Sequence, residues 1–229
     1  MLEACDSPFS SPADAERALL LAASRGDAHT ALAAIVSGAN PNARTDDHLS
    51  RTALMIAASM GRPGVLDALL PHCDARLADF NGHTALMLCA LAPGRGAVDC
   101  MRALIPHSDP QAADTAGRDA LSASASRGKA DCCALLMAFS DPRRQGVDGR
   151  TALAWAAANG RSDCCALLAP FSDLEAVETF TGMNASALAR SGGHFGAAAA
   201  IEACRERLDI DRLTPKGPLR GVFAGKIRI

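Results

Sequence analysis

Apolar and polar residues along the chain alternate in short blocks, and the pattern returns about every 33 residues. In the clearest block, Thr151 precedes an Ala-rich stretch that ends at Gly160. A second apolar stripe follows from Ser162 to Ala169, and Pro170 comes directly after it. Thr can cap the start of a helix, Gly can end one in a left-handed turn, and Pro stops one. Each block therefore predicts two short helices joined by a tight turn.

The residue that starts the first helix recurs along the chain at steps of 32, 35, 32 and 33 residues. A glycine that ends this helix follows nine residues after Thr52, and again at the equivalent place in later blocks. The helix-start residues are Thr52, Thr84, Asp119, Thr151 and Asn184, and the turn glycines are Gly26, Gly61, Gly128, Gly160 and Gly193.

Helices this short are marginal on their own, because isolated helices below about 12–15 residues hardly form in water. Each unit must gain its stability by stacking on its neighbours. The pattern therefore predicts an all-α solenoid of about six helix-turn-helix units, with atypical units at both ends. We expect a disordered leader over 1–12, repeats over 13–208 and a basic Pro/Gly-containing tail over 209–229, with units near 13–47, 48–79, 80–114, 115–146, 147–179 and 180–208.

The recurring Gly-x-Thr-Ala-Leu segments resemble the ankyrin repeat, a helix-turn-helix unit of about 33 residues. The resemblance covers roughly Ala13 to Leu208. It implies that partners dock on the concave side, which loop tips and first helices form. The chain departs from the family pattern at two positions of the unit, which implies less rigidly fixed helix starts in the same fold. The family's Pro is replaced at Ala53, Ala85, Ala120 and Ala152, and its His is replaced at Met55, Met87, Ser122 and Ala154.

Composition supports helices and narrows the choice of partner. Hydrophobic residues make up 49% of the chain but aromatic residues only 3%, so the apolar content is mostly small and aliphatic. The net charge of −2 does not favour a nucleic-acid partner. No signal peptide or membrane-spanning stretch is apparent. We therefore expect a soluble, cytoplasmic monomer that binds neither nucleic acid nor a membrane.

The sequence gives little support for a catalytic or metal-binding site. Nine cysteines are present without a CxxC pair, and Cys132-Cys133 and Cys164-Cys165 recur one period apart on the apolar side of the second helix. Small apolar packing explains them better than a metal or redox site. Trp155 is likewise predicted to lie in the core. Because no P-loop, Gly-x-Ser-x-Gly or His-Glu-x-x-His motif occurs, we expect no catalytic residues, no metal, no cofactor and no small-molecule substrate.

The position directly before each helix-start residue carries Arg51, His83, Arg118, Arg150 or Met183, so four of the five are basic or can become so. Stacking would align these residues in a column at about 10 Å per unit. One interpretation is a basic groove suited to an acidic or amphipathic protein segment. The other, equally open, is that these arginines are simply solvated. The candidate partner-binding residues are Arg51, Phe80, Asn81, His83, Arg118, Arg127, Arg150, Asn159 and Phe180.

The main functional hypothesis is a non-enzymatic adaptor or scaffold that binds a protein partner on this face. The alternative is a regulatory subunit, such as an inhibitor or an assembly chaperone, that covers the working surface of an enzyme. The sequence does not distinguish the two, because repeat stacks share a backbone and differ in their exposed residues.

Overall fold

The computed structural model describes residues 9–92 and 96–213. Over these residues the chain forms twelve α-helices and two short 3₁₀-helices, with three isolated β-bridges in place of strands. The predicted all-α repeat architecture is confirmed. The helices are α1 Pro12–Arg25, α2 Ala28–Val36, α3 Ala53–Ser59, α4 Pro63–Leu69, α5 Ala85–Leu91, α6 Ala97–Leu104, α7 Ala120–Arg127, α8 Ala130–Leu136, α9 Ala152–Ala158, α10 Ser162–Leu168, α11 Ala185–Ser191 and α12 Phe195–Leu213, with η1 Ile105–His107 and η2 Ala169–Phe171.

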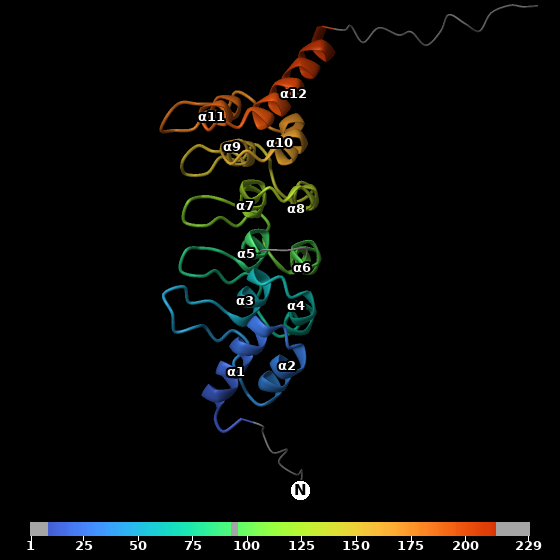
Figure 1. The fold of residues 1–229 in the computed structure, drawn as a ribbon. Coiled ribbons are helices and arrows are strands. Elements are labelled where there is room, and N and C mark those ends of the chain that lie inside the picture. Colours follow the sequence, from blue (N-terminus) through green and yellow to red (C-terminus); the bar gives the residue numbers. More distant parts are fainter. Residues whose placement is uncertain (1–8, 93–95, 214–229) are drawn as a thin grey trace, which may run out of the picture.

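The helices stack in two columns (Figure 1). Odd-numbered helices contact one another from unit to unit, and even-numbered helices do the same beside them. Long loops extend from the side of the odd-numbered helices in successive units (Figure 1). The face made by these loops and the odd-numbered helices is called the loop-side face below.

The first helix of each central unit begins at a side-chain cap. The Thr151 hydroxyl accepts a hydrogen bond from the backbone N–H of Ala154 at 3.2 Å, and Asp119 accepts one from Ser122 at 2.8 Å. Such caps satisfy backbone donors that the first turn of a helix leaves open. All the helix-start residues named from the sequence serve as caps in this way: Thr52, Thr84, Asp119, Thr151 and Asn184.

The core runs along the stack between the two helix columns. A leucine follows one residue after each helix-opening alanine and is 0–1% exposed at Leu54, Leu86, Leu121 and Leu153. The paired cysteines Cys132-Cys133 and Cys164-Cys165 are buried in the second column, at 0–1% exposure. These thiols therefore act as small apolar residues at the helix contacts.

Backbone hydrogen bonds join the loop of each unit to the next. The Phe80 N–H donates to the Leu49 carbonyl at 3.0 Å, and the Thr115 N–H donates to the Asn81 carbonyl at 3.0 Å. Further along, the Val147 N–H donates to Ala116 at 3.2 Å and the Thr179 N–H donates to Asp148 at 2.9 Å. Successive loops are thus held in register.

At the chain ends, α1 begins at Pro12, and α12 continues beyond residue 208, where the repeats were expected to end, to Leu213. Most of the expected leader and tail lie outside the described residues. Within the described residues, no helix combines the length and apolarity needed to cross a membrane.

Candidate protein-binding face

The predicted partner-binding residues all belong to the loops or to the ends of the odd-numbered helices. Phe80 and Phe180 lie at loop tips and are 78% and 83% exposed. Asn81 is half-buried beside Phe80. Arg127, the last residue of α7, and Asn159, which follows α9, are exposed. These residues can therefore reach a partner on the loop-side face.

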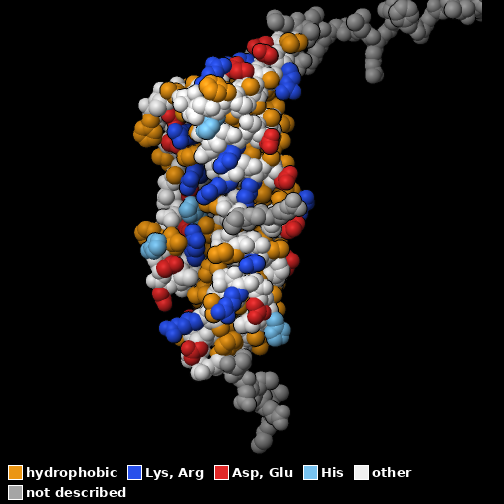
Figure 2. All heavy atoms as spheres, viewed as in Figure 1, with side chains coloured by type: hydrophobic (Ala, Val, Ile, Leu, Met, Phe, Trp, Pro, Cys, Tyr) orange, Lys and Arg blue, Asp and Glu red, His pale blue; other side chains and the backbone are white. Residues whose placement is uncertain are grey.

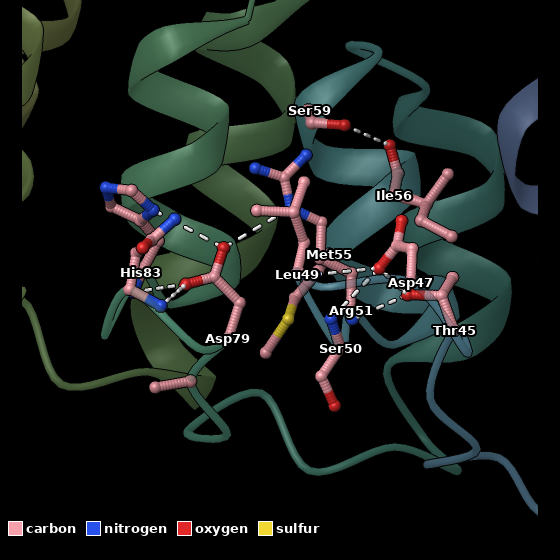
Figure 3. A network of polar contacts seen from close by, with 12 residues as sticks. Thr45, Asp47, Leu49, Ser50, Arg51, Met55, Ile56, Ser59, Asp79 and His83 are labelled. Carbon is pink, nitrogen blue, oxygen red and sulfur yellow. Dashed lines mark hydrogen bonds and ion pairs between the residues drawn. The ribbon is translucent and has the colours of Figure 1, made fainter.

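The predicted column of basic residues is present, but carboxylates accompany it. Asp79 lies between Arg51 and His83 (Figure 3). Its Oδ2 atom is 3.3 Å from Arg51 Nε and 3.3 Å from His83 Nδ1. The other ring nitrogen of His83, Nε2, is 3.5 Å from Asp114 Oδ2. Both aspartate side chains are buried, at 0% and 3% exposure.

The pairing continues along the column. Arg118 NH2 is 2.8 Å from Asp114 Oδ2, and Arg150 Nε is 2.5 Å from Glu178 Oε2. The Glu178 side chain is 1% exposed. At Arg51, Arg118 and Arg150, each guanidinium group therefore lies beside a buried carboxylate, so the column carries paired charges.

The sequence itself carries a signal for part of this pairing. An acid stands four residues before the basic residue in Asp79-x-x-Gly82-His83 and in Asp114-x-x-Gly117-Arg118. The Asp114 carboxylate accepts hydrogen bonds from the backbone N–H groups of Ala116 and Arg118, both at 2.9 Å. Each aspartate therefore fixes its loop and neutralises a basic side chain.

Hydrogen bonds hold the pKa of Glu178 below its ordinary value. The Thr181 hydroxyl donates to Glu178 Oε1 at 2.5 Å and is the largest cause, and Arg150 adds a hydrogen bond and its charge. Each contact stabilises the ionised form of the carboxyl group. Glu178 is therefore a carboxylate at neutral pH, and Arg150 remains paired.

Trp155 differs from its predicted place in the core, since it is only partly buried on α9. The guanidinium carbon of Arg150 lies 4.9 Å from the centre of its ring, and that of Arg118 lies 5.5 Å away. Both contacts are within the range of cation–π attraction. The indole Nε1 is buried and has no hydrogen-bond partner among the described residues.

A pocket of about 310 Å³ opens beside Trp155 on the loop-side face. It brings together four residues of the predicted set, His83, Arg118, Arg127 and Asn159, whereas Arg51, Phe80, Asn81, Arg150 and Phe180 do not line it. Four further residues line the pocket and were not predicted to bind a partner: Leu91, Ser126, Trp155 and Arg161. Figure 2 shows Lys and Arg side chains gathered at the level of α7 on the face that it draws.

The cysteines provide no comparable site. Each described cysteine is a free thiol, and Cys133 Sγ lies 4.0 Å from Cys164 Sγ, within hydrogen-bond reach for sulfur. That hydrogen bond, followed by burial, raises the pKa of the Cys133 thiol above its ordinary value. Within the described residues, no group of three or more His, Cys, Asp or Glu side chains is placed to hold a metal ion.

Stacked helix pairs, side-chain caps and loops joined in register define a helical repeat protein with a loop-side face. A family model for three copies of the ankyrin repeat matches residues 19–114 and 90–180. The chain belongs to the ankyrin repeat family. Ankyrin repeat domains are generally protein-binding modules and typically are not catalytic.

Two solved structures are similar to this chain in fold. An ankyrin repeat domain from Acinetobacter baumannii AYE is 21% identical, with a TM-score of 0.67, and the match covers 82% of this chain and 97% of that one. The ankyrin repeat protein EF0377 is 22% identical, with a TM-score of 0.67 and the same coverage, 82% and 97%. No curated protein matches the chain.

Proposed function

We propose that this chain is a non-enzymatic adaptor that binds a protein partner, through an acidic or amphipathic segment, on its loop-side face. One observation carries the proposal: the tips of three loops each expose a large apolar side chain. Phe80, Val147 and Phe180 are 78%, 77% and 83% exposed. Aromatic residues, phenylalanine included, are enriched in protein interfaces, so exposed phenylalanines at loop tips suit contact with a partner.

The loop register supports the same proposal. Because backbone hydrogen bonds join neighbouring loops, the exposed tips form part of a braced surface. A rigid surface loses little conformational entropy when a partner binds, so more of the contact energy appears as affinity. The partner would contact apolar tips first and reach the basic residues that lie behind them.

Affinity purification from the native cell tests this proposal with a triple variant, Phe80→Ser, Val147→Ser and Phe180→Ser. We expect this variant to lose captured partners, with affinity for any purified partner falling about 10-fold or more, since truncating even one anchor residue of an interface costs about 2 kcal/mol or more. Assaying the activity of a captured enzyme then distinguishes an adaptor from an inhibitor, because an adaptor leaves its turnover intact.

The chain offers a matched control on its other side. Phe139 and Phe171 follow second-column helices and are 49% and 53% exposed. The variant Phe139→Ser, Phe171→Ser removes two exposed, though less exposed, aromatic side chains without touching the loop tips. Equal loss of partner in both variants, or no loss in the tip variant while both remain folded by circular dichroism, would count against the loop-side face.

A further inference from the structure

Resting on the proposed function, we propose that the pocket beside Trp155 receives a glutamate side chain from an acidic segment of the partner. The name "Trp155 pocket" is used for the hollow lined by His83, Leu91, Arg118, Ser126, Arg127, Trp155, Asn159 and Arg161. It is a distinct place on the loop-side face, separate from the exposed loop tips.

The charge of the Trp155 pocket favours an anion. Three guanidinium groups line it, and none of the described lining residues is a carboxylate. Asp114 already pairs with Arg118 at 2.8 Å, but Arg127 and Arg161 form no ion pair with any described residue. Asp163 belongs to two adjoining hollows and forms no salt bridge with Arg161 in the described structure. Two guanidinium groups therefore remain for a ligand.

Guanidinium groups suit a carboxylate in particular. Their planar N–H donors match its two oxygens, and such charge-assisted contacts are stronger than neutral hydrogen bonds. Arg161 is held in place by a hydrogen bond from its Nε to the Ser126 carbonyl at 3.3 Å. Asn159 is held by one from its Nδ2 to the Trp155 carbonyl at 2.8 Å. These contacts position part of the pocket wall before any ligand arrives.

The apolar part of the pocket favours glutamate over a bare anion. Leu91 and the Trp155 ring supply non-polar wall, and a pocket of about 310 Å³ is larger than a single small ion fills. The methylene groups of a glutamate side chain cover such a wall while its carboxylate meets the guanidinium groups. The Trp155 Nε1 donor, which is buried and unpartnered, adds a hydrogen bond if the ring edge turns toward the carboxylate.

An earlier pair of units carries arginines at the same two positions and serves as an internal control for the Trp155 pocket. Arg25 ends α1 and Arg62 precedes α4, as Arg127 ends α7 and Arg161 precedes α10. Arg62 lies against Gly26 as Arg161 lies against Gly128. The residue at the place of Trp155 in that earlier unit is Ile56. The same pair of arginines is thus present twice, once with the aromatic wall and once without it.

The full chain can be tested with a capped hexaglutamate peptide, because Trp155 is the single Trp and no Tyr is present. Intrinsic fluorescence then reports from the pocket itself, and calorimetry gives the affinity. We expect hexaglutamate to change the fluorescence and to bind, and hexaglutamine not to. The double variant Arg127→Gln, Arg161→Gln should weaken binding about 10-fold or more, whereas Arg25→Gln, Arg62→Gln should change it less than about 2-fold.

Several outcomes overturn the proposal. These are hexaglutamate binding with equal affinity to both double variants, failure of the peptide to bind, and equal binding of hexaglutamine. Inorganic phosphate that binds more tightly than hexaglutamate would assign the pocket to a phosphorylated group instead. Circular dichroism of both variants checks that they remain folded.

The two proposals fail separately. Partner capture that depends on Phe80, Val147 and Phe180, without peptide binding, keeps the loop-side face and overturns the Trp155 pocket. Peptide binding through Arg127 and Arg161, with capture indifferent to the loop tips, keeps the Trp155 pocket and overturns the loop tips as the place where the partner binds.

Discussion

Individual arginines on the loop-side face have different roles although they look alike in the sequence. Arg118 and Arg150 lie beside buried carboxylates and also cover the Trp155 ring. Arg127 and Arg161 form no ion pair with a described residue and remain exposed. Replacing a paired arginine with an acidic residue would place a negative charge against a buried acid. Such a variant would therefore change the stability of the protein as well as its binding of a partner.

Comparing Arg118→Glu with Arg127→Glu tests this difference. We expect Arg118→Glu to lower the free energy of unfolding by about 2 kcal/mol or more, because Asp114 loses a charged hydrogen-bond partner and gains a like charge. Arg127→Glu should change it by less than about 0.5 kcal/mol, as surface substitutions usually do. Urea unfolding followed by circular dichroism measures both. Equal effects would mean that the Arg118–Asp114 pair contributes nothing to stability.

At the scale of the elements, the loops depend on close backbone contacts between neighbouring units. Gly117 has φ +77, and a Cβ atom there would lie 2.6 Å from the backbone nitrogen of Val147 in the next loop. Both the left-handed backbone and the contact exclude a side chain. The hydrogen bond from the Val147 N–H to the Ala116 carbonyl lies at this same junction. Loop register is therefore fixed where two units touch.

The variant Gly117→Ala should lower the free energy of unfolding by about 1–3 kcal/mol, because alanine at positive φ is strained and its Cβ displaces Val147. Gly64→Ala is the control: Gly64 lies within α4, and nothing lies within 4 Å of an added Cβ. This change should raise stability by about 0.5–1 kcal/mol, since alanine favours helix. Thermal unfolding distinguishes the two, and a neutral Gly117→Ala would show that the loop adapts freely.

For the whole molecule, stability is distributed along the stack, because each helix contacts mainly its own partner and the equivalent helices next to it. Free thiols occur along much of this stack, from Cys73 after α4 to Cys204 in α12. Burial raises the pKa of the Cys73 thiol to about 11, and burial, with the nearby Cys164, raises that of Cys165 to about 12. The folded chain therefore disfavours the thiolate form of cysteine at two places along the stack, after α4 and within α10.

Alkaline pH should destabilise the whole stack. Well below about pH 8.5, the ordinary thiol pKa, the folded and unfolded states bind the same number of thiol protons. Between about 9 and 12 the unfolded chain releases protons that Cys73 and Cys165 retain when folded, so the free energy of unfolding falls as pH rises. Urea unfolding in reducing buffer at pH 7, 9, 10 and 11 measures the slope. Cys165→Ala should flatten it, and an unchanged slope in that variant would exclude Cys165 as a source.

The sequence by itself determined the repeat, the helix starts, the buried leucines and the burial of the paired cysteines. These features are local or involve the next unit in register, so a period of about 33 residues is enough to predict them. Thr151 and Asp119 cap their helices for reasons visible within three residues of each.

Only the tertiary structure decided which charges are neutralised between units and where a pocket forms. Arg51 and Asp79, like Arg150 and Glu178, are 28 residues apart in the chain and meet because units stack. The repeat pattern says that such residues lie in neighbouring units, but not which acid an arginine reaches. Trp155 likewise follows the apolar pattern, yet its ring is too large for the position that Ala123 fills one unit earlier, and it lies partly exposed between two arginines.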